Sequence, residues 1–238
     1  MHVRLAAESL IGLLMVPPDF LSQGRQPATA HAGDASSDAA FRRHLRNSLK
    51  DARENLGDHE RWFKAIQACT HLGNSTEFRR ARRIGLYVSI GAECPTLPLI
   101  ITAEAQDKQL YFPVLLPAWM GSLSFARADA GSHWQNNRYG IPEPRPTATE
   151  DIRPARHLDL LILPLVGFDK SGNRLGMGAG YYDRCLEFRR HRRHWRRPLL
   201  IGLAFDCQQA DRIPAQPWDV PLDAVVTESG LRIFKQEN

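Results

Sequence analysis

The segment at residues 164–184 carries the residue types and spacing most able to do chemistry. Three glycines alternate just before a stretch of helical character: Gly176, Gly178 and Gly180. Glycine lets the backbone bend and lets a ligand approach closely, and free N–H groups at a helix start attract anions. Lys170 and Arg174 precede these glycines and could neutralise phosphate oxygens, while Asp183 follows and could hold Mg²⁺. The pattern predicts a site for a polyphosphate nucleotide.

Two known phosphate-binding motifs do not occur in this segment. The chain has no G-x-x-x-x-G-K-[ST], and a G-x-G-x-x-G that begins at Gly176 would need glycine where Tyr181 stands. Neither a P-loop nor a standard dinucleotide fingerprint applies. From the glycine spacing alone, an ordinary strand-to-helix turn with an incidental aspartate stays an open alternative.

The whole segment is more specific than its glycines. Residues 168–170 and 174–183 match a phenylalanine–aspartate–lysine turn followed by R-L-G-x-G-x-G-[YF]-Y-D. That pattern resembles the 5-formyltetrahydrofolate cyclo-ligase family, also called methenyltetrahydrofolate synthetase, and the resemblance covers roughly residues 40–228. It implies an enzyme that uses ATP and Mg²⁺ to convert 5-formyltetrahydrofolate into 5,10-methenyltetrahydrofolate, with release of ADP and phosphate.

The resemblance implies that a helix and the glycine segment hold ATP. The family opens with a helix carrying a K-x-x-x-R pair, and Arg42 and Arg46 occupy those positions, with arginine in place of the usual lysine. One helical turn separates them, so both can point at one phosphate chain. Arg174 and Lys170 are the implied catalytic cations. The implied ATP-binding residues are Arg42, Arg43, His44, Leu45, Arg46, Arg174, Leu175, Gly176, Met177, Gly178, Ala179, Gly180, Tyr181 and Tyr182.

The resemblance also implies a folate site beside the first strand. Residues 87–93 look like the family segment whose glutamate binds the pteridine ring, and a carboxylate suits the N–H donors of a pterin. On its own, Glu93 would be an ordinary solvated loop carboxylate. Tyr139 begins a stretch similar to the family's aromatic-x-I-P-x-P and could line the folate pocket. The implied substrate-binding residues are Val88, Glu93, Tyr139, Met177, Gly178, Ala179, Gly180 and Tyr181.

Two aspartates are the implied Mg²⁺ ligands. Asp183 closes the glycine segment, and Asp223 falls where the family has a second Mg²⁺-associated aspartate, although alone it would be an ordinary carboxylate at a strand start. Ala179 departs from relatives that have glycine or lysine at this place. A missing charge-assisted contact removes about 1.5–3 kcal/mol, which other cations of the site would have to supply.

The elements that must position these residues alternate between helix and strand. Apolar residues recur at helical spacing over residues 38–56, and further helices are expected over 59–71 and near 95–105. Strands are expected over 83–89, 108–114, 123–128, 158–163, 199–205, 224–227 and 231–234, with a loop over 131–150. The near-continuous apolar run at 158–163 is typical of a central strand covered on both faces. This pattern predicts an α/β fold, a layered, Rossmann-like helix–sheet–helix arrangement with a mainly parallel central sheet, in a single domain.

Composition bounds the remaining properties. With 238 residues and 43% hydrophobic content, the chain can form one sizeable core, and we expect residues 38–238 to be the catalytic domain. Residues 1–37 contain a short apolar run and then a stretch rich in Ala, Gly, Ser, Asp and Pro, which predicts a flexible extension rather than a secretory signal. No run of about 18 apolar residues occurs, and the four cysteines lie far apart. We expect a cytoplasmic monomer with no membrane partner.

Two other classes of function stay open at this point. Residues 189–197 read RRHRRHWRR, and basic residues around Trp195 are typical of nucleic-acid binding. A solvated basic helix end explains the same pattern, and we expect no nucleic-acid partner. A folate-binding storage or sensing protein would keep the fold without turnover, and the departures at Arg42 and Ala179 allow it. Tight folate binding without ATP consumption would mark that reading.

Overall fold

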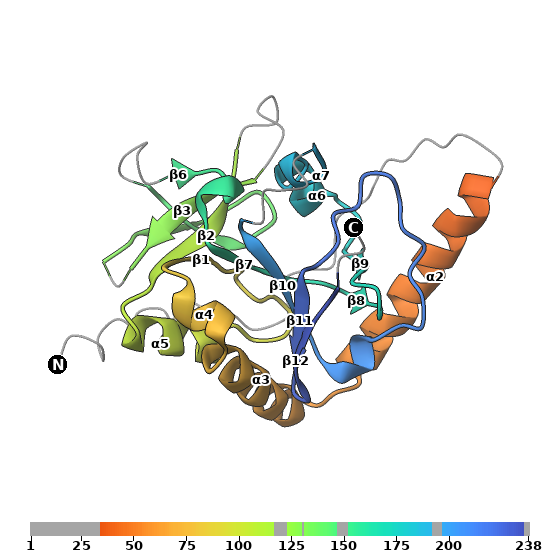
Figure 1. Cartoon of the computed structure of the whole chain (residues 1–238), viewed down its shortest axis with the longest axis horizontal. Coiled ribbons are helices and arrows are strands. Elements are labelled where there is room, and N and C mark those ends of the chain that lie inside the picture. Colours follow the sequence, from red (N-terminus) through yellow and green to blue (C-terminus); the bar gives the residue numbers. More distant parts are fainter. Residues whose placement is uncertain (1–33, 117–122, 130, 147–151, 192–196, 236–238) are drawn as a thin grey trace.

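The computed structural model describes residues 34–116, 123–129, 131–146, 152–191 and 197–235 (Figure 1). Within these residues, eight strands form one sheet in the order β12-β11-β10-β7-β1-β2-β3-β6. Their bounds are β1 (Arg83–Gly85), β2 (Gln109–Leu115), β3 (Leu123–Ala128), β6 (Ile152–Arg153), β7 (Leu160–Leu163), β10 (Leu199–Leu203), β11 (Ala224–Thr227) and β12 (Gly230–Ile233). The strands β11, β10, β7, β1 and β2 run parallel, while β12, β3 and β6 pair antiparallel with their neighbours. The predicted α/β fold with a mainly parallel sheet is confirmed.

Helices cover both faces of this sheet. The helices α3 (Asp58–Gly73), α4 (Thr76–Arg80) and α5 (Leu97–Ala105) lie below it in Figure 1, and α6 (Tyr181–Cys185) and α7 (Phe188–His191) lie above it, near η4 (Ala155–His157). Along β7, Leu160 and Ile162 belong to one core, and Leu161 and Leu163 belong to the other. All four side chains are fully buried, as expected for a parallel strand covered on both sides.

The strand order reverses at β1. The chain passes from β1 to β2 on one side, and later returns to β7 on the other side of β1. In open α/β sheets, ligands bind in the crevice outside the carboxyl ends of the strands where the order reverses. The loops that follow β1 and β7 are therefore the places where a site is expected. The strand β1 ends at Gly85, shorter than predicted, so residues 86–93 are free to form that loop.

The long helix α2 (Asp34–Glu54) lies at one end of the molecule, beside the segment that follows β7 (Figure 1). Its Leu49 is buried against Val166, Leu175 and Ile213. Gly167 lies directly opposite, where a Cβ atom would overlap the Leu49 side chain. The α2 backbone is thereby fixed beside the segment that follows β7, and the basic side chains of α2 are carried to that segment.

A small hairpin, β8 (Gly167–Phe168) and β9 (Arg174–Leu175), leads into the glycine segment. The carboxylate of Asp169 organises its turn: Oδ1 accepts the N–H groups of Ser171 at 2.9 Å and Asn173 at 3.0 Å. Its Oδ2 accepts the N–H of Ile213 at 2.9 Å. Lys170 lies on this turn and is exposed.

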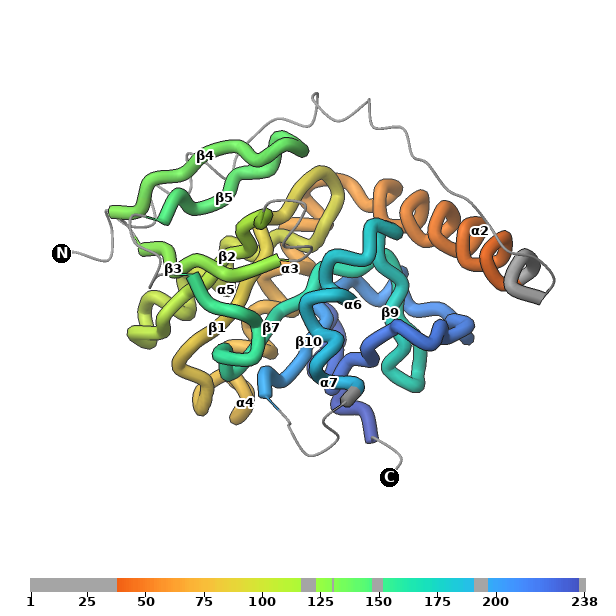
Figure 2. Tube along the Cα trace, turned by 90° about the horizontal axis from the view of Figure 1, so that it is seen from above, coloured from red at the N-terminus to blue at the C-terminus, as the bar shows by residue number. Residues whose placement is uncertain are grey.

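A second hairpin forms where a loop was predicted over residues 131–150. The strands β4 (Trp134–Asn136) and β5 (Pro142–Pro144) pair with each other, and β5 lies against β2. The Trp134 ring packs edge-on against Phe112 at 5.1 Å between centroids, and the Glu143 carboxylate accepts the N–H of Leu115 at 3.0 Å. Proline is tolerated because this is an edge strand. Figure 2 shows the hairpin at one side of the molecule and α2 at the other.

Two predicted features fall largely outside the described residues. Of the expected extension at residues 1–37, the structure describes only the first turn of α2, and of the basic stretch at 189–197 it does not describe residues 192–196, including Trp195. The described ends of that stretch pair within the fold. Arg189 donates to Asp223 at 2.8 Å, and Arg197 donates to Asp159 at 2.9 Å. None of the described helices is long and apolar enough to cross a membrane.

Candidate active site

A cleft of about 660 Å³ opens at the carboxyl ends of β1 and β7, where the strand order reverses. Its walls come from α2, the loop after β1, the facing ends of β2 and β3, the β4–β5 hairpin, the segment 174–183 and residues 216–219. In size it suits a small-molecule site. One side is lined by cations and glycines, and the other is mostly apolar.

The cationic wall is built from α2. Arg42 and Arg46 lie one turn apart and both line the cleft. The Arg42 guanidinium donates to the Asp219 carboxylate at 2.7 Å and to the Pro214 carbonyl. Arg46 Nε donates to the Gly176 carbonyl at 2.8 Å. Burial, and after it the neighbouring charge of Arg42, lower the pKa of Arg46 from its ordinary value, so an anion bound in the cleft would stabilise its charged form. Such a pair suits an anionic ligand.

The glycine loop, residues 176–180, faces these arginines. Gly178 and Gly180 have φ values of 105° and 67°, a region that glycine adopts at little cost. A Cβ atom at Gly178 would lie 4.0 Å from the Arg46 guanidinium. Within the described part of the chain, the backbone N–H groups of residues 176–180 donate no hydrogen bond. Because residues 176–180 line the cleft and their N–H groups have no acceptor in the described protein, these groups are available to donate to a phosphate chain.

Asp183 is the carboxylate next to this loop. It accepts a hydrogen bond from Arg174, whose side chain is only 5% exposed, while Asp183 keeps 23% exposure. Among the described residues, no group of three or more His, Cys, Asp or Glu side chains is placed to hold a metal ion. Mg²⁺ at nucleotide sites commonly uses one or two carboxylates together with phosphate oxygens and water. The residues present fit a Mg²⁺ ion that arrives with a nucleotide.

The apolar wall begins in the loop after β1. Tyr87, Val88, Ile90 and Glu93 line the cleft there, facing the apolar side chains of β2, β3 and the hairpin. The loop is held by the Tyr87 hydroxyl, which donates to the Cys94 carbonyl at 2.6 Å. Glu93 Oε2 accepts the N–H of Ile90 at 3.2 Å. Burial raises the pKa of the Glu93 carboxyl to about 7. N–H donors of a bound ligand would stabilise the charged carboxylate.

The structure brings most of the predicted site residues together. The following predicted residues line the cleft: Arg42, Arg46, Val88, Glu93, Tyr139, Arg174, Gly176, Met177, Gly178, Ala179, Gly180, Tyr181, Tyr182 and Asp183. Arg43, His44, Leu45, Lys170, Leu175 and Asp223 do not. Arg43 and His44 are exposed on other faces of α2, Leu45 packs toward the core, and Leu175 is fully buried.

Lys170 and Asp223 lie outside the cleft lining. Lys170 is exposed on the β8–β9 turn, away from the cleft lining. Asp223 directly precedes β11, and so lies at the amino edge of the parallel strands. Its carboxylate accepts from Arg189 at 2.8 Å and from the Leu200 N–H at 2.8 Å. The geometry gives Asp223 a structural role at the opposite edge of the sheet from the cleft.

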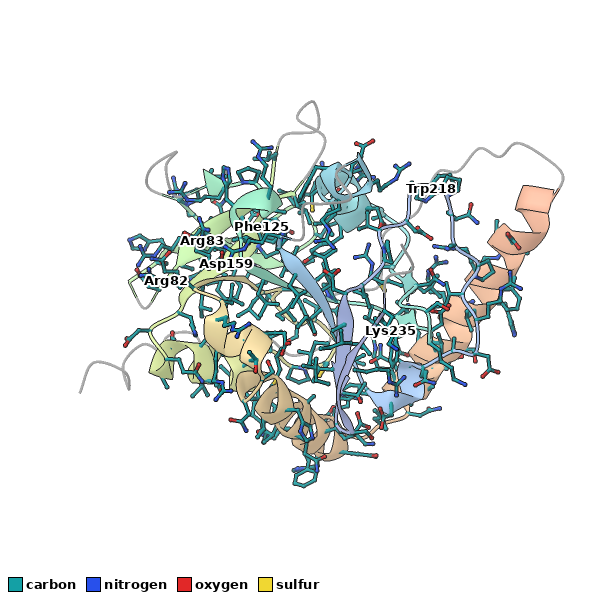
Figure 3. The ribbon with its side chains drawn as sticks, in the orientation of Figure 1. Arg82, Arg83, Phe125, Asp159, Trp218 and Lys235 are labelled. Atoms are coloured by element: carbon teal, nitrogen blue, oxygen red, sulfur yellow. The ribbon has the colours of Figure 1, made fainter. Side chains whose placement is uncertain are left out.

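Several cleft residues were missed by the sequence reasoning. They are Tyr87, Ile90, Pro113, Leu115, Leu123, Asn137, Ile141, Pro142, Pro164, Leu165, Gln216, Trp218 and Asp219. Trp218, labelled in Figure 3, is 57% exposed although it lines the cleft. Trp218 and Asp219 lie a few residues before Asp223, the aspartate that the resemblance implied. The missed residues in the loops after β1, β4 and β7 share one signal, their position after the end of a strand.

Comparisons with known proteins agree with this geometry. The sequence model of the 5-formyltetrahydrofolate cyclo-ligase family matches residues 38–228. The 5-formyltetrahydrofolate cyclo-ligase of Haemophilus influenzae is 38% identical over 183 residues, covering 76% of this chain and 94% of that protein. The protein of the same name in Escherichia coli K12 is 36% identical over 181 residues, covering 76% and 97%. The solution structure of Aquifex aeolicus 5,10-methenyltetrahydrofolate synthetase superimposes with a TM-score of 0.70 at 28% identity, covering 83% and 95%.

Proposed function

The chain belongs to the 5-formyltetrahydrofolate cyclo-ligase family. We propose that its cleft binds ATP and 5-formyltetrahydrofolate side by side, so that the γ-phosphoryl group of ATP can be transferred to the formyl oxygen. The enzyme converts 5-formyltetrahydrofolate into 5,10-methenyltetrahydrofolate. The observation that carries the assignment of the cleft is its two-sided lining, with arginines and a glycine loop facing an apolar wall that contains Glu93. A polyphosphate suits the first side and a flat heterocycle suits the second.

The phosphates of ATP lie against Arg42, Arg46 and the glycine loop. Arg46 donates to the Gly176 carbonyl of this loop, and Arg42 lines the same cleft, where it donates to Asp219. The loop N–H groups have no acceptor among the described residues. Guanidinium groups pair well with phosphate oxygens because two parallel N–H donors match two acceptors. Arg174 stands behind the loop, and through Asp183 it fixes the first turn of α6. Its role is to position that carboxylate and to add positive charge near the transferred phosphoryl group.

The chemical difficulty is that a formamide oxygen is a very poor leaving group. The formyl oxygen attacks the γ-phosphorus, the bond from that phosphorus to the bridging oxygen breaks, and ADP leaves. The N10 amine then attacks the formyl carbon, the carbon–oxygen bond breaks, and inorganic phosphate departs with the oxygen. The N10 proton passes to solvent. Two reactions of this kind need positioning and charge stabilisation and no protein nucleophile.

Asp183 is the cleft carboxylate that would hold Mg²⁺ carried in with ATP. When bound, the ion would neutralise charge on the phosphate oxygens. Asp183 keeps its carboxylate partly open while Arg174 fixes it from behind. Asp223 is not part of this proposal because its carboxylate is engaged by Arg189 and Leu200.

Glu93 and Val88 bind the pterin end of the folate. The carboxylate stands among apolar neighbours, and its raised pKa reflects burial without a strong donor in the unliganded cleft. Pterin N–H and amino groups supply the missing donors. Tyr139 and Met177 border the same space, and both are exposed large apolar side chains that a ligand would cover.

We propose a monomeric enzyme, because the residues assigned here to ATP, folate and Mg²⁺ all line one cleft of a single chain. All four cysteines are free thiols, and Cys69 and Cys94 are buried. Free thiols suit the reducing conditions of the cytoplasm, which is the compartment proposed here.

The test is absorbance at the methenyl-folate band while purified protein meets 5-formyltetrahydrofolate and Mg²⁺, with ATP added or withheld. ATP-dependent growth of the band, weakened by Asp183→Asn and kept by the control Glu54→Gln, supports the proposal. Glu54 is an exposed residue of α2 outside the cleft lining. Tight folate binding with no band at high enzyme concentration would instead indicate a storage or sensing protein.

A further inference from the structure

Two tyrosines and two arginines form a cluster on the rim of the cleft. We call Arg138, Tyr139, Tyr181 and Arg184 the rim cluster. The Tyr139 and Tyr181 hydroxyl oxygens lie 2.7 Å apart, and their rings pack edge-on with centroids 6.1 Å apart. Tyr139 comes from the β4–β5 hairpin and Tyr181 from the start of α6. The cluster therefore joins two walls of the cleft that are far apart in sequence.

Both arginines are held against these rings. Arg138 donates to the Tyr181 hydroxyl at 2.5 Å, and its guanidinium carbon lies 5.1 Å from the Tyr139 ring centre. The Arg184 guanidinium carbon lies 5.0 Å from the Tyr181 ring centre, and its Nη1 donates to the Ala179 carbonyl at 3.0 Å. Cation–π contacts and a hydrogen bond fix the direction of a guanidinium before any ligand arrives.

Both arginines of the rim cluster are exposed, so the cluster places positive charge on the protein surface. Arg138 is exposed, and among the described residues it forms no ion pair with a carboxylate. Partial burial opposes ionisation of Tyr181, but hydrogen bonds from Tyr139 and Arg138 and the charge of Arg184 outweigh it, and the pKa of Tyr181 is lowered. The electrostatic environment at this rim thus favours negative charge.

The proposed substrate carries negative charge at the end remote from its pterin. A folate consists of a pterin, an aminobenzoyl group and a glutamate, which has two free carboxylates. Desolvating a carboxylate against apolar side chains is costly, so the glutamate cannot stay against the wall that holds the pterin. The arginines of α2 face the glycine loop and are committed to ATP. The hairpin continues the apolar wall through Ile141 and Asn137 to Tyr139, and so leads from the pterin site to the rim cluster.

We propose that Arg138 binds the glutamate carboxylates of the folate, including the further γ-linked glutamates of longer folates. The inference rests on the proposed function and adds Arg138 as a residue that determines specificity for the folate tail. A guanidinium fork binds a carboxylate through two parallel N–H donors, and charge-assisted bonds of this kind are the strong ones. Arg138 therefore sets affinity for the tail and takes no part in phosphoryl transfer.

The experiment compares three substrates that differ only in the tail. They are 5-formyltetrahydropteroate, which lacks glutamate, 5-formyltetrahydrofolate, and its triglutamate. Dissociation constants are measured by calorimetry without ATP, and KM and kcat by methenyl absorbance with ATP. The variants are Arg138→Gln, Arg138→Lys and the control Arg82→Gln. Arg82 is exposed before β1 and lies far from the cleft residue Trp218 in Figure 3.

Arg138→Gln is expected to weaken binding of the monoglutamate about tenfold, which corresponds to about 1.4 kcal/mol, and to weaken binding of the triglutamate further. The pteroate constant, kcat and the KM for ATP stay at wild-type values. Arg138→Lys recovers part of the loss, and Arg82→Gln changes nothing. Equal weakening of all three substrates would overturn the proposal, because Arg138 would then act only by holding the two tyrosines. Unchanged constants throughout would overturn it too. Wild-type protein that binds the folates but never forms the methenyl product would refute the proposed function and leave the tail comparison valid.

Discussion

Replacing Glu93 with glutamine is expected to stabilise the unliganded enzyme while weakening its hold on folate. The Glu93 carboxyl lies in the apolar wall of the cleft and accepts one backbone N–H from Ile90 at 3.2 Å. Burial raises its pKa from 4.5 to about 7, and the hydrogen bond from Ile90 and the charge of Arg53 offset only part of that rise. Glutamine keeps the size and the acceptor oxygen but never carries charge.

The sign of the pH effect follows from this shift. A carboxyl whose pKa is higher in the folded state than in the unfolded state contributes stability that is fully present below the unfolded value and is lost as pH rises through the folded value. For Glu93 the window runs from about pH 4.5 to about pH 7. The wild-type enzyme therefore loses stability across this window, and the glutamine variant does not.

The magnitude comes from the two pKa values. Each unit corresponds to about 1.4 kcal/mol, so the full window is worth roughly 3 kcal/mol. Between about pH 5.5 and about pH 8, the stability of Glu93→Gln relative to wild type should rise by roughly 2 kcal/mol. In a domain of this size, that corresponds to a relative rise in Tm of about 4–8 °C.

The assay is urea or thermal unfolding of wild type, Glu93→Gln and the exposed control Glu54→Gln at both pH values, repeated with saturating 5-formyltetrahydrofolate. Because each variant is compared with wild type at the same pH, other titrating groups cancel. Saturating folate should reverse the order, since its N–H donors favour the charged carboxylate. A stability difference that is the same at both pH values would refute the argument from burial.

Four further substitutions test the remaining parts of the site. Asp183→Asn should lower kcat on the order of a hundredfold because it weakens charge stabilisation at the phosphoryl group, whereas Asp223→Asn should leave kcat near wild type and cost roughly 2 kcal/mol of stability, as steady-state rates and unfolding curves will show. Gly178→Ala should raise the KM for ATP about tenfold, because a φ of 105° strains an L residue by about 1–2 kcal/mol. Arg42→Lys should raise the KM for ATP several-fold, which corresponds roughly to the loss of one hydrogen bond. Lysine keeps the charge but lacks the planar guanidinium that contacts Asp219 and the Pro214 carbonyl together.

Each of these expectations has an opposite outcome. A large loss of kcat in Asp223→Asn with unchanged Tm would restore a metal role for that residue. A wild-type KM for ATP in Gly178→Ala, or in Arg42→Lys, would mean that the loop or the fork does not contact the phosphates.

The fold and the chemistry of the glycine loop could be read from local pattern. The apolar run at residues 158–163 predicted a strand buried on both faces, and the side chains of residues 160–163 alternate between two cores. The helical spacing of Arg42 and Arg46 predicted that they share a direction, and both line the cleft. These features depend on residue type and on the repeat of a helix or strand, which the sequence displays directly.

The choice between Asp219 and Asp223 shows what local pattern could not decide. Asp219 and Asp223 lie close together in the sequence, in the loop that leads into β11. Asp223 precedes β11, where the backbone enters the sheet at its amino edge, and it accepts from Arg189 and Leu200. Asp219 lies earlier in the loop, which returns past α2, and it accepts from Arg42 instead. The edge of the sheet at which a loop residue lies depends on the strand order, and strand pairing is a long-range property.

The sequence by itself determined which residues can bend around a phosphate, which can pair with one, and that the helices and strands alternate. Only the tertiary structure decided that the hairpin of residues 134–144 and the start of α6 meet at Tyr139 and Tyr181, and that Arg189 and Arg197 neutralise Asp223 and Asp159 within the fold. The physical reason is that a residue's type is fixed locally. Its partner is set by contacts between segments distant in the chain, and those form only when the sheet assembles.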